Sequence, residues 1–303
     1  MSLRVSVVMS VHNGEKYLRD AIESILGQTF TDFEFIVIDD GSSDGSSEIV
    51  AAYTDQRIRF IRNEQNIGLT RSLNKGLELA GGAYIARMDS DDVSLPERLA
   101  KQVAFMDANL EVGACGTWAL DIDEAGHTIG RRETLVGDQL DNFYWRTSLI
   151  HSSSIFRFSQ THGPWYDPVM PVSQDYDLWL RIRAQLKLSN LSEHLLLYRV
   201  HPKSITSVNR DQQINSAYQA FSKHVGEEGG FSFEVFKALM GYSHKIDPLR
   251  RSLAMMRLAK QIHKPYRVFL KDDLEYARKW FLTRESGAAQ ASQGRKSLGA
   301  LLL

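Results

Sequence analysis

The run Asp89-Ser90-Asp91-Asp92 contains the side chains of this sequence that are best suited to direct chemistry. It follows a short apolar stretch, residues 83–86, and precedes a turn and Pro96. Carboxylate oxygens at the end of a strand suit a divalent cation, and such a cation could also touch a diphosphate. A solvated acidic turn has the same local sequence. The rest of the chain must therefore decide between these two interpretations.

Strand-like and helix-like segments alternate four times before residue 110, which predicts a parallel α/β sheet. Asn13 is expected to cap the first helix, and Pro96 to lie in the first turn of the fourth. The predicted strands are residues 5–9, 33–38, 58–61 and 83–88, and the predicted helices cover residues 18–26, 49–52, 69–80 and 95–109.

Polar clusters follow three of these strands, at residues 10–13, 39–43 and 89–92. Ligands of open α/β sheets bind at the carboxyl ends of the strands. We therefore expect the three clusters to meet at one rim of the sheet and to form a site there.

The second half of the chain is less regular. Strands are expected at residues 114–121 and 155–158 as a mixed extension of the sheet, and a helix at 174–186. The predicted domains are a catalytic domain over residues 1–210, a helical C-terminal extension over 211–285, and a flexible tail over 286–303 that is rich in small and polar residues.

The composition is ordinary for a globular protein, with 43% hydrophobic and 24% charged residues among 303. Cys115 is the only cysteine, so an intrachain disulfide is excluded. The sequence has no signal-peptide pattern and no run of 18 apolar residues, which predicts a cytoplasmic protein. Residues 241–303 carry 13 Lys and Arg against 5 Asp and Glu, a net charge of +8. This basic part could contact the inner face of the plasma membrane, or simply be a set of solvated helix faces; a nucleic-acid partner is not expected.

Several common catalytic motifs are absent from the sequence. It contains no P-loop, no GxGxxG after the first strand, no Cys/His zinc pattern and no nucleophile elbow. The remaining candidate chemistry is that of carboxylates.

Asp40 and the acidic cluster are the first candidates for such chemistry. Asp40, at the end of the second strand, could accept a hydrogen bond from a base N–H or could form the turn before Gly41. Asp91 is the best candidate for a metal ligand, Asp89 could bind a ribose hydroxyl or a metal-bound water, and Asp92 is expected to support the loop or cap the next helix.

Four candidates in the second half each have a structural alternative. Asp175 lies at the start of a predicted helix, where the helix dipole stabilises a negatively charged functional group. Asp is also common as a purely structural N-cap at this position. Arg181 could reach a carboxylate or phosphate, or could be a surface or helix-pairing arginine. His201 could contact a metal or a diphosphate, or be structural, and His151 could line an acceptor pocket or belong to a polar loop.

Six segments together resemble the family 2 inverting glycosyltransferases, and the resemblance covers roughly residues 3–207. Each motif is weak alone, whereas the combination is highly specific. The segments are VSVVMSVHNG at 5–14, SILGQTF at 24–30, FIVIDDGSSD at 35–44, NIGL at 66–69, ARMDSDD at 86–92 and QDYDLWLR at 174–181.

This resemblance implies a GT-A fold, a Rossmann-like mixed sheet flanked by helices, with a nucleotide-sugar site at the carboxyl rim. It implies the following roles: Ser10, His12 and Asp40 around the base, Arg71 near the nucleotide, Asp89-x-Asp91 as the DxD motif with Asp91 on Mn²⁺ or Mg²⁺, Asp175 as catalytic base, and residues 198–204, with His201, closing over the diphosphate.

Two residues depart from the family pattern. His12 stands where Tyr is usual, so the ring available to stack on the base is an imidazole and not a phenol. Gln174 stands where Glu is frequent, so Asp175 lacks an adjacent carboxylate that would raise its pKa.

The implied activity is metal-dependent, inverting transfer of a hexosyl or N-acetylhexosaminyl group. The donor would be a nucleotide sugar, with UDP as the default, and the acceptor a hydroxyl of a glycan or lipid-linked sugar in cell-surface polysaccharide biosynthesis. A sugar nucleotidyltransferase is one alternative, although it needs a Gly-rich basic loop after the first strand and only Gly14, Lys16 and Arg19 occur there. A non-catalytic nucleotide-sugar-binding protein is the other, and intact Asp91 and Asp175 argue against it.

Overall fold

The computed structural model describes residues 3–137, 140, 149–158, 165–202, 204, 210–225 and 233–239. These residues all belong to one compact unit, Met1–Ile246. The basic C-terminal part, residues 241–303, and with it the predicted tail, lie outside the described residues. Within the described ranges, no helix combines the length and the apolar character needed to cross a membrane.

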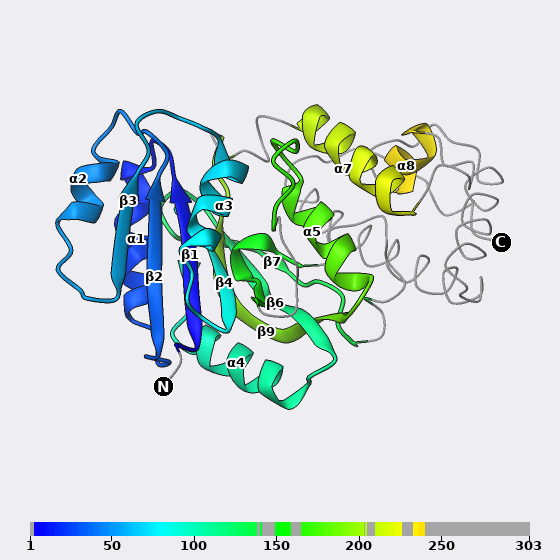
Figure 1. Cartoon of the computed structure of the whole chain (residues 1–303), viewed down its shortest axis with the longest axis horizontal. Coiled ribbons are helices and arrows are strands. Elements are labelled where there is room, and N and C mark those ends of the chain that lie inside the picture. The colour runs from blue at the N-terminus through cyan, green and yellow to red at the C-terminus, as the bar shows by residue number, and fades with distance from the viewer. Residues whose placement is uncertain are drawn as a thin grey trace, which may run out of the picture. The chain divides into compact units, whose positions relative to one another are not determined.

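A nine-stranded mixed sheet runs through this unit in the order β3-β2-β1-β4-β8-β6-β9-β5, with β7 paired to β6 (Figure 1). The first four strands in this order are parallel, whereas β8 is antiparallel to both β4 and β6. This arrangement confirms the predicted α/β class and the mixed extension. The strands are β1 Val5–Val11, β2 Phe33–Asp39, β3 Ile58–Arg62, β4 Tyr84–Asp89, β5 Val93–Ser94, β6 Val112–Ile122, β7 Thr128–Arg132, β8 Ile155–Arg157 and β9 Lys187–Arg199.

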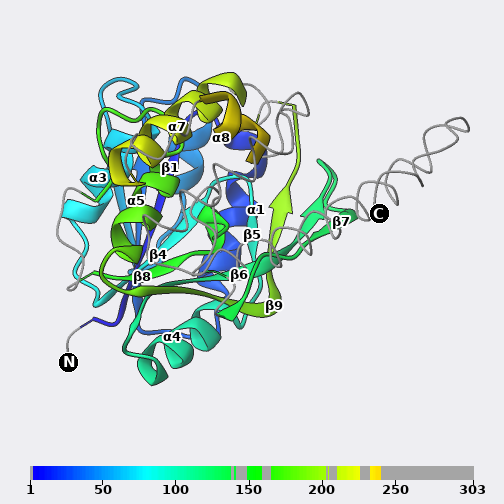
Figure 2. The same ribbon diagram turned by 90° about the vertical axis from the view of Figure 1, so that its right-hand side faces the viewer.

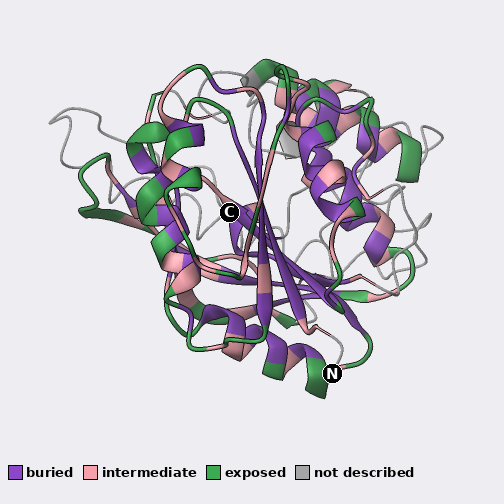
Figure 3. Cartoon of the chain, turned by 60° about the vertical axis from the view of Figure 1, so that its left-hand side comes forward, coloured by how far each residue is buried: buried purple, intermediate pink, exposed green. Residues whose placement is uncertain are grey.

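Helices cover both faces of the sheet because the central strands are apolar on both sides (Figure 3). One hydrophobic core joins the sheet to α1 (Glu15–Leu26), α2 (Ser46–Ala51) and α4 (Arg98–Ala108). A second core joins the opposite face to α3 (Leu69–Glu78) and α5 (Gln174–Arg183).

Two further helices follow the sheet. Helix α7 (Arg210–Val225) packs against α5, and α8 (Phe233–Leu239) packs against α7 (Figure 2). They are the described beginning of the predicted helical extension, whose boundaries stay a prediction.

The strand register brings the three polar clusters to one rim, as predicted. Ser10 of β1 pairs with Ile38 of β2 on one side and with Asp89 of β4 on the other. The N–H of Asp40 donates to the carbonyl of Val11 at 2.8 Å, which extends the pairing into the loops. The ends of β1, β2 and β4 are therefore neighbours.

Two local predictions were wrong. Asn13 does not cap α1: it adopts a left-handed conformation with φ of 52°, and its Oδ1 accepts the N–H of Ser43 at 2.8 Å. Pro96 is not in the first turn of α4, which begins at Arg98. The chain before it is still extended, because the N–H of Leu95 donates to the carbonyl of Leu195 in β9.

Candidate active site

The acidic cluster lies where β4 ends and the chain turns into β5. Carboxylate oxygens of Asp89, Asp91 and Asp92 lie within 4.8 Å of one another. The side chains of Asp89 and Asp91 are about one-third exposed, whereas Asp92 is buried. The turn therefore gathers three carboxyl groups at the rim and leaves two of them open to a ligand.

A histidine from a distant part of the chain completes this cluster. His201 follows β9, and its Nε2 lies 2.9 Å from Oδ2 of Asp91. Its ring is almost buried and lies 5.3 Å from the ring of Tyr17, between the centroids. His201 is thus brought to the predicted metal site; its role as a ligand stays a prediction.

The electrostatics of the cluster favour a bound cation. Burial, together with the charges of Asp91 and Asp89, raises the pKa of Asp92 well above its ordinary value. Burial and the charge of Asp91 also raise the pKa of Asp89, against the neighbouring Arg87 cation. In addition, Oδ2 of Asp92 is buried and accepts no hydrogen bond within the described chain. A divalent cation would offset this repulsion, and the carboxylate oxygens are ligands that suit Mn²⁺ or Mg²⁺.

Asp175 is half-buried in the first turn of α5, one residue past the helix start at Gln174. It is not the N-cap, which is Ser173. Burial, and to a smaller extent the charge of Asp89, raise the pKa of Asp175 to about 6, while two backbone N–H groups and the Arg87 charge act in the opposite direction. The raised pKa of Asp175 is therefore due mainly to its burial, without a carboxylate at Gln174, and Asp89 of β4 adds to it. A carboxyl with such a pKa is suited to accept a proton near neutral pH.

His151 and Tyr166 lie beside these acids. Nε2 of His151 lies 2.8 Å from the hydroxyl of Tyr166, and its ring meets the ring of Trp179 edge-on. Burial and the charge of Arg87 hold the pKa of His151 well below its usual value, so the imidazole is neutral. Burial is the main cause of the raised pKa of the Tyr166 hydroxyl. The negative charges of Asp175 and Asp89 also contribute to this increase.

Asp40 is buried, and the protein already uses both of its oxygens. Oδ1 accepts hydrogen bonds from Nδ2 of Asn63 and the N–H of Ile67, and Oδ2 accepts the N–H of Gly68, all at 2.9 Å. Asp40 therefore anchors the loop that leads into α3. A carboxylate oxygen can accept two hydrogen bonds, so Oδ2 retains capacity for a base N–H.

The other predicted nucleotide contacts surround Asp40. His12 is exposed, and its Nδ1 lies 2.9 Å from the carbonyl of Asp40. Ser10 is almost buried at the end of β1. Arg71 is exposed on the first turn of α3 and forms no ion pair with any other described residue. Their contact with a nucleotide stays a prediction.

Arg181 forms hydrogen bonds within the protein. Its Nε donates to Oδ2 of the buried Asp177 at 2.9 Å, and its Nη2 donates to the carbonyl of Trp165. Oδ1 of Asp177 in turn lies 2.7 Å from Nε2 of His224 in α7. Asp177, and not Arg181, makes the contact with α7, and a contact of Arg181 with acceptor or diphosphate stays a prediction.

Two arginines of the site were missed from the sequence. Arg87 is buried in β4 and pairs with Asp89, while its Nη1 donates to backbone carbonyls of Val8 and Met88. Arg98, also buried, donates to the carbonyls of Ser152 and Arg87, and burial lowers its pKa to about 10. Arg87 could have been found from the sequence, because it is a charged residue within the otherwise apolar strand that precedes Asp89.

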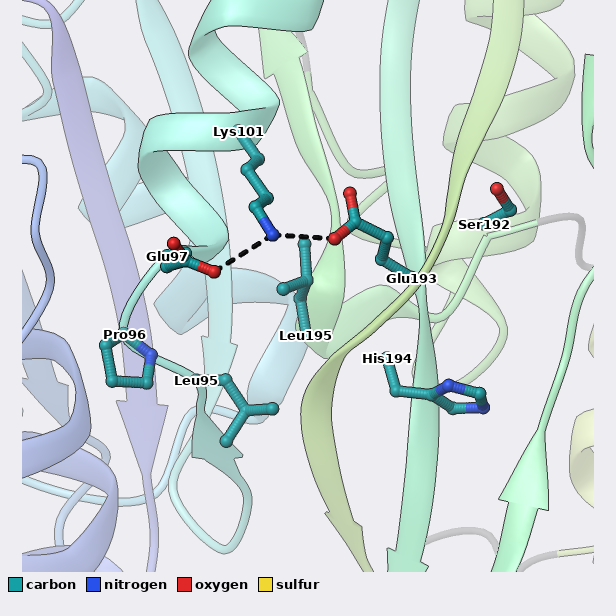
Figure 4. Close-up of a pocket in the computed structure, with 8 residues that line it drawn as sticks. All are labelled: Leu95, Pro96, Glu97, Lys101, Ser192, Glu193, His194 and Leu195. Atoms are coloured by element: carbon teal, nitrogen blue, oxygen red, sulfur yellow. Dashed lines mark hydrogen bonds and ion pairs between the residues drawn. The ribbon is translucent and has the colours of Figure 1, made fainter.

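A surface depression of about 530 Å³ lies away from these residues, between the start of α4 and β9 (Figure 4). Lys101 spans it, with Nζ at 2.9 Å from Glu97 and 2.6 Å from Glu193. None of the predicted site residues lines it. The chemistry of the rim is therefore separate from this depression.

The comparison with known proteins decides the family. Residues 6–161, more than half of the chain, match the domain described as glycosyl transferase family 2. The chain belongs to this family. It is 38% identical over 204 residues to an uncharacterized glycosyltransferase of Methanocaldococcus jannaschii, a match that covers 65% of this chain and 70% of that protein. It is also 36% identical over 221 residues to the O-antigen biosynthesis glycosyltransferase WbnJ of Escherichia coli, covering 67% and 84% of the two chains.

Two solved structures confirm the GT-A-like fold of this glycosyltransferase. S. aureus TarS 1–349 in complex with UDP-GlcNAc aligns with a TM-score of 0.60 and 18% identity, covering 98% of this chain and 95% of that one. The mannosyltransferase PcManGT from Pyrobaculum calidifontis, in complex with GDP-Man and Mn²⁺, aligns with a TM-score of 0.57 and 16% identity, covering 96% and 76%.

Proposed function

We propose that this glycosyltransferase moves a hexosyl or N-acetylhexosaminyl group from a nucleotide sugar to a hydroxyl of a glycan or lipid-linked acceptor, with inversion. The observation that carries the proposal is the presence of the acidic cluster together with Asp175, whose pKa is raised to about 6 mainly by burial and also by the charge of Asp89. One group suits a cation and the other suits a general base, and an inverting displacement needs both.

The residues that would hold the cation are Asp91, with Asp89, Asp92 and His201 around it. When bound there, a divalent cation supplies charge neutralisation for the departing diphosphate. Asp175 takes the proton from the acceptor hydroxyl as that oxygen attacks the anomeric carbon. His151, held neutral, and Tyr166 border the acceptor side.

The donor would lie over the ends of β1 and β2 and the start of α3. Ser10, His12, Asp40 and Arg71 would surround the base and ribose, and the free capacity of Oδ2 of Asp40 supports a hydrogen bond to a base N–H. UDP is the preferred donor nucleotide, in keeping with the UDP-GlcNAc bound by TarS. The likeness to WbnJ supports a place in surface polysaccharide biosynthesis.

The pH dependence of transfer should report Asp175. The base must be ionised, so kcat/KM should rise with pH through a pKa near 6 and level off above it. Roughly a tenth of the carboxylate is ionised one pH unit below that pKa. A pH–rate profile at saturating Mn²⁺ measures this limb. A profile that stays flat well below pH 6 would contradict the assignment of Asp175.

The proposed reaction is tested with a panel of UDP- and GDP-sugars, by following release of the nucleoside diphosphate. We expect one donor to be hydrolysed slowly with Mn²⁺ and not with EDTA, because water can replace the acceptor. Tight donor binding without turnover in the presence of Mn²⁺ and a mixed glycan acceptor pool would support a non-catalytic binding protein instead. Formation of a nucleotide sugar and pyrophosphate from a nucleoside triphosphate and sugar phosphate would indicate a nucleotidyltransferase.

A further inference from the structure

Arg199, the last residue of β9, has a side chain that is only 3% exposed and is hydrogen-bonded to the acidic cluster. We propose that Arg199 is a positioning residue that holds Asp91 and His201 where both can reach one divalent cation. The inference rests on the proposed function, since it concerns the same site, but it assigns a role to a residue outside the predicted ligand set.

Arg199 fixes the acidic cluster through its main chain and its side chain together. Its Nε donates to the carbonyl of Asp91 at 2.8 Å, and its backbone N–H donates to Oδ1 of Asp92 at 2.8 Å. One residue therefore sets the backbone of the first acid and the side chain of the second. Neither bond uses the oxygens that Asp91 would offer to a cation.

The rest of the guanidinium holds two other elements against the cluster. Nη1 donates to the carbonyls of Asp123 and Glu124 in the β6–β7 turn, each at 3.3 Å. Nη2 pairs with Oδ2 of Asp20 in α1 at 3.2 Å. The planar fork of arginine can serve such separate acceptors at once, whereas the single ammonium of lysine cannot.

Tyr17 packs against both Arg199 and His201. The guanidinium carbon of Arg199 lies 4.4 Å from the ring centroid of Tyr17, and the His201 ring lies 5.3 Å from the same centroid. The hydroxyl of Tyr17 donates to Oε2 of Glu124 at 3.0 Å, which ties this ring to the β6–β7 turn. His201 therefore rests on a surface that Arg199 helps to build.

The backbone between Arg199 and His201 is short and hydrogen-bonded, so the two residues cannot move independently. Val200, between Arg199 and His201, donates its N–H to the carbonyl of Ile122 at 2.8 Å. A shift of Arg199 would move His201 and release the carbonyl of Asp91 together. Groups that orient metal ligands from behind change metal affinity about 10–100-fold when they are removed.

The test is Arg199→Lys, which keeps the positive charge and loses the fork. Mn²⁺ affinity, measured by calorimetry without any donor, should fall about 10–100-fold. The matched control is Arg157→Lys. Arg157 is also buried, donates to backbone carbonyls of Val112 and Asn109, and lies over the ring of Tyr84. Arg157 therefore resembles Arg199 in its burial, its backbone acceptors and its tyrosine neighbour, but it lies beside Tyr84 at the start of β4, away from the acidic cluster.

Arg157→Lys should lower the melting temperature and leave Mn²⁺ affinity unchanged. A folded Arg199→Lys variant whose Mn²⁺ affinity stays within about twofold of the native protein overturns the positioning role. If Asp91→Ala abolishes Mn²⁺ binding in that case, only the inference fails. If Asp91→Ala also binds Mn²⁺ normally, the proposed function fails with it.

A second variant keeps the inference testable if Arg199→Lys does not fold. Asp20 is largely exposed, so Asp20→Asn should fold while it removes the charged partner of Nη2. We expect Mn²⁺ affinity to fall by more than about twofold, less than for Arg199→Lys. An unchanged Mn²⁺ affinity in Asp20→Asn would contradict the proposal that the orientation of the Arg199 guanidinium positions the metal ligands.

Discussion

Asp175→Asn should bind the donor with near-native affinity and lose glycosyl transfer by roughly 10²-fold or more, the scale of general-base catalysis. The substitution keeps the size and the hydrogen-bonding reach of the side chain and removes its basicity. Steady-state kinetics with Mn²⁺ and donor calorimetry separate these two effects. Transfer at the native rate would exclude Asp175 as the base.

The same substitution should also stabilise the fold. Burial raises the pKa of Asp175 to about 6, so the ionised carboxylate costs stability in the folded state. This cost is absent at low pH and develops as pH rises from the unfolded pKa to the folded one. Above that pH range, Asp175→Asn should increase the free energy of unfolding by about 1–3 kcal/mol. Each kcal/mol should raise the melting temperature by about 2–4 °C.

Asp177→Asn is the matched control in the same helix. Although burial alone would raise the pKa of Asp177, hydrogen bonds from His224 and the Arg181 charge lower it below its usual value. Its ionised form therefore stabilises the fold above the unfolded pKa, and that stability is lost as pH falls. We expect Asp177→Asn to lower the melting temperature near neutral pH, the opposite sign to Asp175→Asn, with a smaller loss of transfer.

Asp91→Ala should abolish the dependence of donor binding on Mn²⁺. With the cation ligand gone, donor affinity in the presence of Mn²⁺ should fall to the value measured with EDTA. The Mn²⁺-induced rise in melting temperature should disappear as well, because that rise reports binding to the folded state. Without Mn²⁺ the variant should be no less stable, since Asp91 raises the pKa of both Asp89 and Asp92.

Asp121→Ala is the control for this second prediction. Asp121 is a partly exposed acid of β6 that pairs with Arg132 at 2.8 Å and is outside the acidic cluster. Its loss should leave the Mn²⁺ effect on donor binding intact. Equal donor affinity with and without Mn²⁺ in the native protein, or an unchanged Mn²⁺ effect in Asp91→Ala, would contradict the ligand role.

The rim of the sheet could be predicted because it depends on local signals and topology. Apolar, β-branched runs followed by Asp39-Asp40 and Asp89 identify buried parallel strands and their carboxyl ends. Strand β9 was not predicted, since register shifts against β6 between Thr117 and Ala119 interrupt the alternation that would mark it.

The buried polar contacts of the site depend on residues far apart in the chain. Arg87, Arg98 and Arg199 each donate to backbone carbonyls, and their sequence neighbourhoods do not specify those carbonyls. The raised pKa of Asp175 likewise depends on burial and on Asp89. From the sequence, Gln174 indicated that no adjacent carboxylate would raise this pKa, and the burial that does raise it is a property of the fold.

The configuration of the released sugar tests the central claim most directly, because it requires the donor and Mn²⁺ but no acceptor. Proton NMR of the first product, before mutarotation, should show the anomer opposite to that of the donor sugar. Asp175→Asn should show no comparable release. A product that retains the donor configuration, or equal release from Asp175→Asn, would contradict a single displacement with Asp175 as the base.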